Sequence, residues 1–218
     1  MQRTLFVITF LTWSISILCT TLSFSDELKP IQLLKPQVDK GRPLMQVLKD
    51  RSSSRSFSKE KLPIQVLSDL LWAAFGVNRT DTGKRTAPSA MNRQEIDVYV
   101  ATADGLYLYD AKAHALTPIL SEDIRAMTGT QEYVKDAAIN LIYVADYSKM
   151  GTATKEDKDI YSAADTGFIS QNVYLYCASE GLATVVRGSI DRQALAKVMK
   201  LRPEQKIILA QSVGYPKK

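Results

Sequence analysis

The sequence of this 218-residue chain predicts an α+β fold, with a central, mostly antiparallel sheet flanked by helices. The first observation is a hairpin signal, Asp104-Gly105, between two strand-like runs. The second is an almost wholly apolar run at 137–146, as expected of a strand in the middle of a sheet. The third is a long helical pattern at 159–181, followed by two further strand-like runs. This mixed order, without an internal repeat or a linker, indicates one domain.

The other elements follow from local patterns. Apolar residues recur at helical spacing in 63–77, where Pro63 suits a first turn and Gly76 an end. Shorter helices are predicted at 43–50, at 122–128 with Ser121 as the cap, at 130–135 and at 191–199. Predicted strands cover 96–103, 106–109, 115–120, 137–146, 182–186 and 206–213, and residues 78–92 are predicted to be a polar loop.

The long helical pattern carries an apolar stripe and ends at Gly181, which suits a helix C-cap. The stripe consists of Ile160, Ala164, Phe168, Leu175 and Ala178. It predicts a helix in the centre of the core. Because several neighbouring residues are small, the alternative is that the helix is buried in a subunit interface.

Composition excludes several kinds of site. The formal net charge of +5 comes from scattered basic residues, which suits a small anionic ligand better than nucleic acid. The chain has one His and two Cys, so a His-based catalytic triad or a His/Cys zinc site is not expected, and we predict no metal. His114 lies in a polar turn, where a structural role is expected.

Residues 1–25 have the pattern of a secretory signal peptide. One basic residue precedes an apolar run, and small residues at Ser23 and Ser25 suit cleavage before Asp26. We therefore predict an exported, periplasmic protein without a stable membrane span after cleavage. The alternative is an uncleaved N-terminal anchor, since the apolar run approaches the length that spans a bilayer. Residues 26–41, with two Pro and three Lys, predict an extended arm before the domain at 42–218.

The stretch from Arg51 to Arg55 is a candidate phosphate site. Two guanidinium groups, which match the geometry of a phosphate, flank Ser52, Ser53 and Ser54, whose hydroxyls add further donors. Such a stretch could hold one phosphate monoester. The alternative is a solvated Arg/Ser loop of the kind common in linkers.

A second candidate segment runs from Ala87 to Gln94. Pro88 fixes a bend before the small residues Ser89 and Ala90, which allow a flat ligand to approach the backbone. The side-chain amides of Asn92 and Gln94 can both donate and accept hydrogen bonds, as the polar edge of a heterocycle requires. The alternative is an ordinary turn.

With these motifs the chain resembles the nitroreductase family of FMN-dependent oxidoreductases over residues 42–218. Four segments in order carry the resemblance: 51–57, 87–94, 171–182 with Arg187-Gly188, and 213–216. The resemblance implies a nitroreductase-like fold and FMN bound between the subunits of a homodimer. The implied phosphate ligands are Arg51, Ser52, Ser53 and Arg55. Pro88, Ser89, Ala90 and Asn92 would line the isoalloxazine from the partner subunit, with Arg187 and Gly188 near its reactive nitrogen.

The implied activity is hydride transfer from NADH or NADPH through the flavin to a nitroaromatic or quinone, by a ping-pong mechanism. Positive charge from Arg187, or a backbone N–H of Arg187 or Gly188, would stabilise the reduced flavin. The alternatives are a flavin-dependent dehydrogenase or oxidase of a small molecule or modified peptide, and a non-catalytic FMN-binding protein.

Two positions depart from the family pattern. Glu95-Ile96 stands where Pro-Trp is common, and the chain stops soon after Gly214-Tyr215-Pro216. Either Lys217 or Lys218 could supply the basic contact to the phosphate, or that contact is missing.

Overall fold

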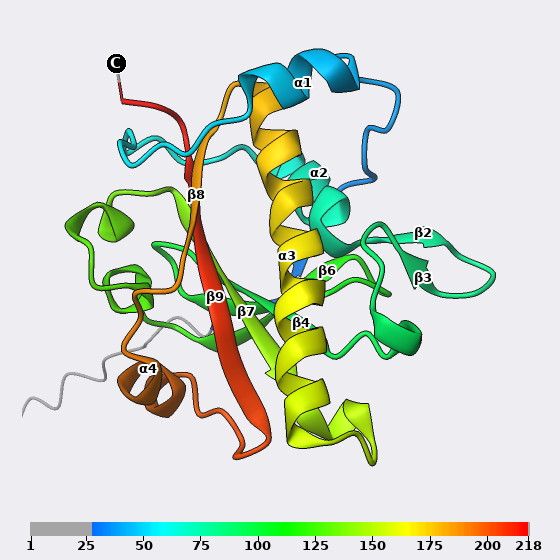
Figure 1. The fold of residues 1–218 in the computed structure, drawn as a ribbon. Helices are drawn as coiled ribbons and strands as arrows, with labels where there is room; N and C mark the ends of the chain where they lie inside the picture. The colour runs from blue at the N-terminus through cyan, green and yellow to red at the C-terminus, as the bar shows by residue number, and fades with distance from the viewer. Residues whose placement is uncertain (1–27, 218) are drawn as a thin grey trace, which may run out of the picture.

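The structure is a computed structural model that describes residues 28–217, and Figure 1 shows its fold. Seven strands form the main sheet in the order β1-β6-β5-β4-β7-β9-β8, and every neighbouring pair is antiparallel. The strands are β1 Ile31–Gln32, β4 Ile96–Ala101, β5 Leu106–Asp110, β6 Ala115–Leu120, β7 Ile139–Asp146, β8 Ala183–Arg187 and β9 Gln205–Gly214. The predicted fold class and the predicted strands are confirmed. The predictions for residues 1–25 and for Lys218 lie outside the described residues.

The middle of the sheet is buried on both faces. Successive side chains of a strand point to opposite faces, and here they enter two different cores. In β4, Val98 and Val100 pack into the core beneath two helices, whereas Tyr99 and Ala101 pack on the opposite side. All eight residues of β7 are buried, which explains its continuous apolar run.

Four α-helices flank the sheet: α1 Leu44–Asp50, α2 Ile64–Phe75, α3 Lys155–Glu180 and α4 Arg192–Val198. In Figure 1, α3 crosses the sheet along its whole height, with α1 and α2 beside its upper half. Leu70, Leu71 and Phe75 of α2 join Ile169 and Val173 of α3 in one core. Helix α4 covers the other face. Short 3₁₀ turns lie at Ala90–Asn92, Arg125–Thr128, Glu132–Lys135 and Tyr147–Met150.

Some local predictions were wrong. Two short strands, β2 Val77–Arg79 and β3 Lys84–Arg85, form a small antiparallel ribbon inside the predicted loop at 78–92. The helix predicted at 122–128 is only a 3₁₀ turn preceded by Ile124, so Ser121 does not cap it. Helix α3 begins four residues earlier than predicted because Thr154 accepts a hydrogen bond from the Asp157 N–H at 3.1 Å.

The predicted core face of α3 was also wrong. Ile160 and Phe168 are 64% and 48% exposed in the single chain, and Ala164 is exposed as well. The core is instead filled by Ile169, Val173 and Cys177. A helical repeat of apolar residues identifies an apolar face but not which surface covers it.

Both ends of the described chain return to the sheet. In the arm, β1 pairs with β6 and becomes an edge strand of the same chain. His114, at a left-handed turn, contacts the Ser68 hydroxyl at 2.8 Å and the Tyr109 hydroxyl at 3.0 Å, consistent with the structural role predicted for it. At the other end, Pro216 forms a bridge with Phe57, directly after the Arg/Ser stretch.

Candidate functional site

The Arg/Ser stretch is an ordered extended segment held from three sides. It begins where α1 ends, with the Arg51 N–H donating to the Val47 carbonyl at 2.8 Å. The Ser54 N–H donates to the Thr184 carbonyl of β8 at 2.9 Å. These backbone bonds place consecutive side chains in defined directions, which argues against a flexible linker.

Tyr174 of α3 is the central anchor of this stretch. Its hydroxyl lies 2.9 Å from the Ser53 hydroxyl and accepts a hydrogen bond from the Val186 N–H at 2.9 Å. The Arg51 guanidinium lies over the Tyr174 ring, 5.2 Å from its centre. One side chain therefore joins the Arg/Ser stretch to the end of β8, immediately before Arg187 and Gly188. Sequence reasoning missed Tyr174, because a Tyr inside a helical pattern carries no signal of this contact.

The donors of the stretch point outward. Ser52, Ser53 and Arg55 are exposed and Arg51 is partly buried, so the two guanidinium groups and the Ser52 hydroxyl remain available to an anion. The C-terminal tail runs beside them, with the Lys217 N–H donating to the Ser56 carbonyl at 3.3 Å. This donor set fits a phosphate group.

The second segment is a tight loop with unusual backbone. Met91, Asn92 and Gln94 all have positive φ, at 54°, 54° and 50°. Residues other than Gly rarely adopt this conformation, and such strain is retained where surrounding contacts determine it. Met91 is 80% exposed, and Pro88 and Asn92 are exposed too, so the loop presents its tip to the outside.

Three contacts hold this loop. The Asp165 carboxylate of α3 accepts a hydrogen bond from the Ala90 N–H at 2.9 Å, and the Ser89 hydroxyl accepts one from the Gln94 N–H at 3.0 Å. The Gln94 side chain accepts from Arg85 Nε at 2.7 Å. The amide of Gln94 is therefore used to build the loop.

Glu95 follows the loop and is fully buried. Neither of its carboxyl oxygens has a hydrogen-bond partner among residues 28–217, and Arg93 Nη1 is also buried without one. Burial raises the pKa of Glu95 to about 7, with a further increase from the negative charge of Asp165 and a partial offset from Arg93. A buried acid thus lies beside the carboxylate that holds the loop.

Arg187 is in the predicted region, but its side chain turns inward. The guanidinium is buried and donates to the Thr128 hydroxyl at 2.8 Å, to the Thr128 carbonyl, and to Asn140 Oδ1 at 2.7 Å. Burial lowers the pKa of Arg187 to about 10. The side-chain charge of Arg187 is therefore used in the interior. The preceding residue, Val186, is joined to the Arg/Ser stretch through the Tyr174 hydroxyl.

The two candidate segments do not meet within one chain. They contact α3 at Tyr174 and Asp165, nine residues apart, which corresponds to about 13 Å along the helix axis. Between and beside these contacts, α3 exposes the apolar side chains of Ile160, Tyr161 and Phe168. The two segments therefore contact α3 at separate positions, with the exposed Phe168 between them in the helix.

Comparison with known proteins identifies the family. Residues 48–215 match the profile of the nitroreductase family. The chain belongs to the nitroreductase family. A nitroreductase-family protein of Methanocaldococcus jannaschii is 30% identical over 169 residues, which cover 73% of this chain and 85% of that protein.

Solved structures of nitroreductases agree with this assignment. A nitroreductase-family protein of Ralstonia eutropha is 43% identical and superposes with a TM-score of 0.84, covering 87% of this chain and 90% of that one. The NADPH:FMN oxidoreductase of Vibrio harveyi, solved with NAD⁺, shares the fold with a TM-score of 0.62 at 18% identity, covering 80% of this chain and 69% of that one. The family membership makes this chain a flavin-dependent oxidoreductase in general terms.

Proposed function

We propose that this nitroreductase binds FMN between two copies of the chain and transfers hydride from NADH or NADPH to a nitroaromatic or quinone acceptor by a ping-pong mechanism. The observation that carries the proposal is the exposed Arg/Ser stretch, anchored by Tyr174, whose hydroxyl also binds the Val186 N–H just before Arg187. When bound, FMN would supply the hydride chemistry, because no side chain of the chain can accept a hydride.

The chain's own residues would hold the cofactor at its two ends. Arg51 and Arg55 would bind the phosphate with charge-assisted hydrogen bonds, and Ser52 and Ser53 would add neutral donors. Lys217 is within reach of the same position, because its backbone is bonded to Ser56. At the ring end, a backbone N–H of Arg187 or Gly188 would stabilise negative charge on the reduced ring. The Arg187 side chain would act only by orienting this segment from the interior.

The partner subunit would complete the ring site with Pro88, Ser89, Ala90 and Asn92. Exposed apolar side chains favour this assembly, since Ile160 and Phe168 on α3 and Leu44 and Met45 on α1 face outward in one chain. Burying such a surface between two subunits is favourable by roughly 25 cal/mol per Å². The same pairing would bring the loop at 88–92 to the Arg/Ser stretch of the other copy.

We also propose export, on the pattern of residues 1–25 alone. In the part of the chain that the structure describes, none of the helices is both long and apolar enough to cross a bilayer. A direct check is N-terminal sequencing of the protein recovered from a periplasmic fraction, with Asp26 expected as the first residue.

The decisive experiment compares FMN binding with turnover. The purified full chain should show flavin absorbance that bleaches with NADH or NADPH under anaerobic conditions and returns when a quinone is added. The double variant Arg51→Ala/Arg55→Ala should bind FMN at least a hundredfold more weakly, since each charged hydrogen bond contributes about 1.5–3 kcal/mol.

The matched control is Lys84→Ala/Lys112→Ala, which removes the same charge from exposed positions outside the stretch. If the Arg double variant retains FMN as tightly as this control, the phosphate assignment is wrong. If FMN binds but neither nucleotide bleaches it, the chain is an FMN-binding protein with another donor or none.

A further inference from the structure

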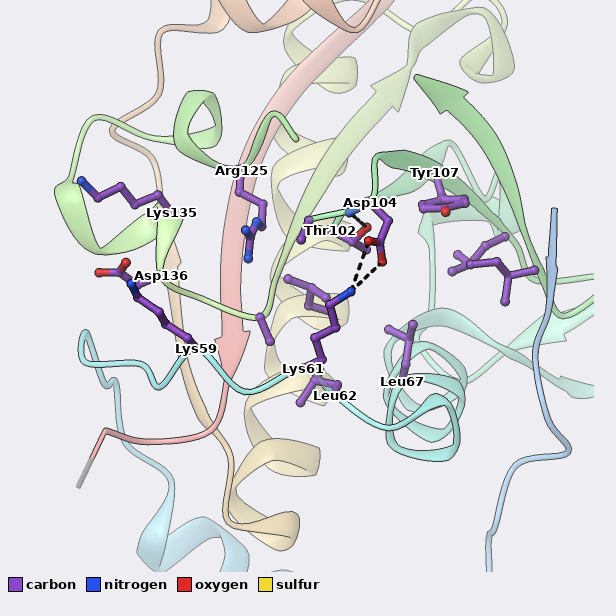
Figure 2. A pocket seen from close by; sticks show the side chains of 15 residues that line it. Lys59, Lys61, Leu62, Leu67, Thr102, Asp104, Tyr107, Arg125, Lys135 and Asp136 are labelled. Carbon is purple, nitrogen blue, oxygen red and sulfur yellow. Dashed lines mark hydrogen bonds and ion pairs between the residues drawn. The ribbon is translucent and has the colours of Figure 1, made fainter. Parts of the chain in front are cut away.

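A cavity on another part of the molecule has no role in the proposed FMN site. It has a volume of about 490 Å³ and lies between the segment at 59–62, the β4–β5 turn and the chain around 125–139 (Figure 2). None of its lining residues belongs to the Arg/Ser stretch, to the loop at 87–94 or to the Arg187-Gly188 segment. Its size falls in the range of small-molecule sites, which is roughly 300–1,000 Å³.

One side of this cavity is apolar. Leu62 and Leu67, the ring of Tyr107, and Leu116 and Ile139 form this wall. In Figure 2, Leu62 and Leu67 lie in the lower part of the view and Tyr107 lies above them on the right. Such a wall would bind a hydrocarbon chain or a ring by removing it from water.

The other side is basic. Lys59, Lys61, Arg125 and Lys135 line the cavity, against two carboxylates, Asp104 and Asp136. Asp104 is already paired with Lys61, with both oxygens 3.2 Å from Nζ. In the portion of the chain that the structure covers, neither Lys59 nor Lys135 has a carboxylate within ion-pair distance. With Asp123, which pairs with Arg125, this side carries four basic and three acidic groups, and the remaining charge of +1 favours an anion.

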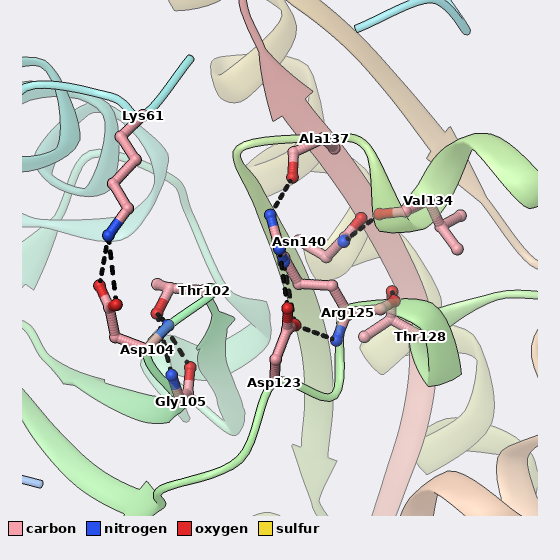
Figure 3. Close-up of polar contacts among 10 residues, drawn as sticks. All are labelled: Lys61, Thr102, Asp104, Gly105, Asp123, Arg125, Thr128, Val134, Ala137 and Asn140. Carbon is pink, nitrogen blue, oxygen red and sulfur yellow. Dashed lines mark hydrogen bonds and ion pairs between the residues drawn. The ribbon is translucent and has the colours of Figure 1, made fainter. Parts of the chain in front are cut away.

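Arg125 is the preorganised group of this basic side. Its Nε and Nη2 donate to Asp123 at 2.9 and 2.7 Å, and its Nη1 donates to the Ala137 carbonyl at 2.9 Å (Figure 3). A guanidinium has five N–H donors, so two have no partner among the described residues. Its side chain is only 18% exposed, and Figure 2 shows it extending into the cavity.

We propose that this cavity binds a small organic acid, with its carboxylate at Arg125, Lys59 and Lys135 and its apolar body against Leu67, Tyr107 and Ile139. Lys61 can turn from Asp104 to the ligand at little cost, because both side chains of this pair are exposed to solvent. The site does not depend on FMN or on a second subunit.

The test uses three ligands that share an eight-carbon chain. Octanoate, octanol and octylamine are titrated into the full chain by calorimetry at pH 7 and low salt. Octanoate should bind at one site per chain and at least tenfold more tightly than octanol, with octylamine weakest. Raising the salt concentration should weaken the binding of octanoate and leave the binding of octanol unchanged.

Two variants locate the site. Ala103→Trp should abolish octanoate binding, because Ala103 is an exposed residue of the cavity lining and a Trp there fills the space. Its control, Ala113→Trp, is exposed outside the cavity and should bind normally. The double variant Lys59→Ala/Lys135→Ala should weaken octanoate binding five- to tenfold. The control double variant Lys84→Ala/Lys206→Ala, at exposed positions outside the cavity, should leave octanoate binding unchanged.

Several outcomes would overturn the proposal. No saturable binding of octanoate, or equal affinity for all three head groups, would exclude a site for organic acids. Octanoate binding that survives Ala103→Trp would place the ligand elsewhere. Binding that both lysine pairs weaken equally would reflect overall charge and would also contradict the assignment.

Discussion

Glu95→Gln tests whether a buried acid beside the loop at 87–94 makes stability depend on pH. The pKa of Glu95 is raised from the ordinary value of 4.5 to about 7, mainly by burial. The folded protein therefore holds the proton more tightly than the unfolded chain does. Stability is highest below pH 4.5, falls as the pH rises from 4.5 to 7, and stays reduced above that window.

The magnitude follows from the two pKa values. Each pH unit between 4.5 and about 7 costs about 1.4 kcal/mol, so an ionised Glu95 lowers the free energy of unfolding by about 3 kcal/mol. Gln is uncharged at all of these pH values and nearly isosteric. Glu95→Gln should therefore be about 3 kcal/mol more stable than the wild-type chain at pH 8, and similar to it at pH 5.

The assay is urea unfolding followed by circular dichroism at pH 5, 6, 7 and 8, with the same saturating FMN throughout. Glu122→Gln is the matched control, because it makes the same chemical change at an exposed position. The reasoning would be refuted if the free energy of unfolding changed equally with pH in the wild type and in Glu95→Gln. A wild-type free energy of unfolding that rises from pH 5 to 7 would refute it as well.

Three further substitutions test other contacts. Phe168→Asp should shift the chain from dimer to monomer in analytical ultracentrifugation, whereas a wild-type chain that is already monomeric would contradict the proposed interface. Tyr174→Phe removes the hydroxyl that joins Ser53 to the end of β8, and should weaken FMN binding five- to tenfold in a fluorescence titration; unchanged affinity would show that this anchor is dispensable. Gly129→Ala would place a methyl group 2.5 Å from the buried Arg187 guanidinium, and should lower the free energy of unfolding by about 1–3 kcal/mol in urea; a neutral result would show that this region relaxes easily.

The sheet could be predicted because its strands satisfy local rules. The alternation of side chains along the strand identified β4, and a continuous apolar run identified β7. Both patterns follow directly from how strands are buried. The Arg/Ser stretch could be singled out as a candidate anion site because its chemistry is local, and that assignment stays a prediction. The anchor Tyr174 could not, because it reaches the stretch only through the packing of α3 against β8.

Helix α3 shows what an apolar pattern leaves open. Its sequence carries two apolar faces, of which Ile169 and Val173 enter the core while Ile160 and Phe168 remain exposed. A helical repeat shows only that certain apolar residues share one face of the helix. Both sets of residues in α3 satisfy this repeat. Only the position of the sheet decides between them, and that position depends on contacts distant in sequence.

The loop before β4 gives a physical reason for the buried acid at position 95. Met91, Asn92 and Gln94 are strained, and strain of this kind costs of order 1–3 kcal/mol for each residue. Asp165 offsets part of that cost through the Ala90 N–H, and this bond is strongest when Asp165 carries its charge. A protonated Glu95, the main form below its raised pKa of about 7, does not compete with this charge, whereas an ionised Glu95 repels it. The protonation of Glu95 is therefore coupled to the loop that would line the flavin, so loss of its proton should loosen the loop before it affects the sheet.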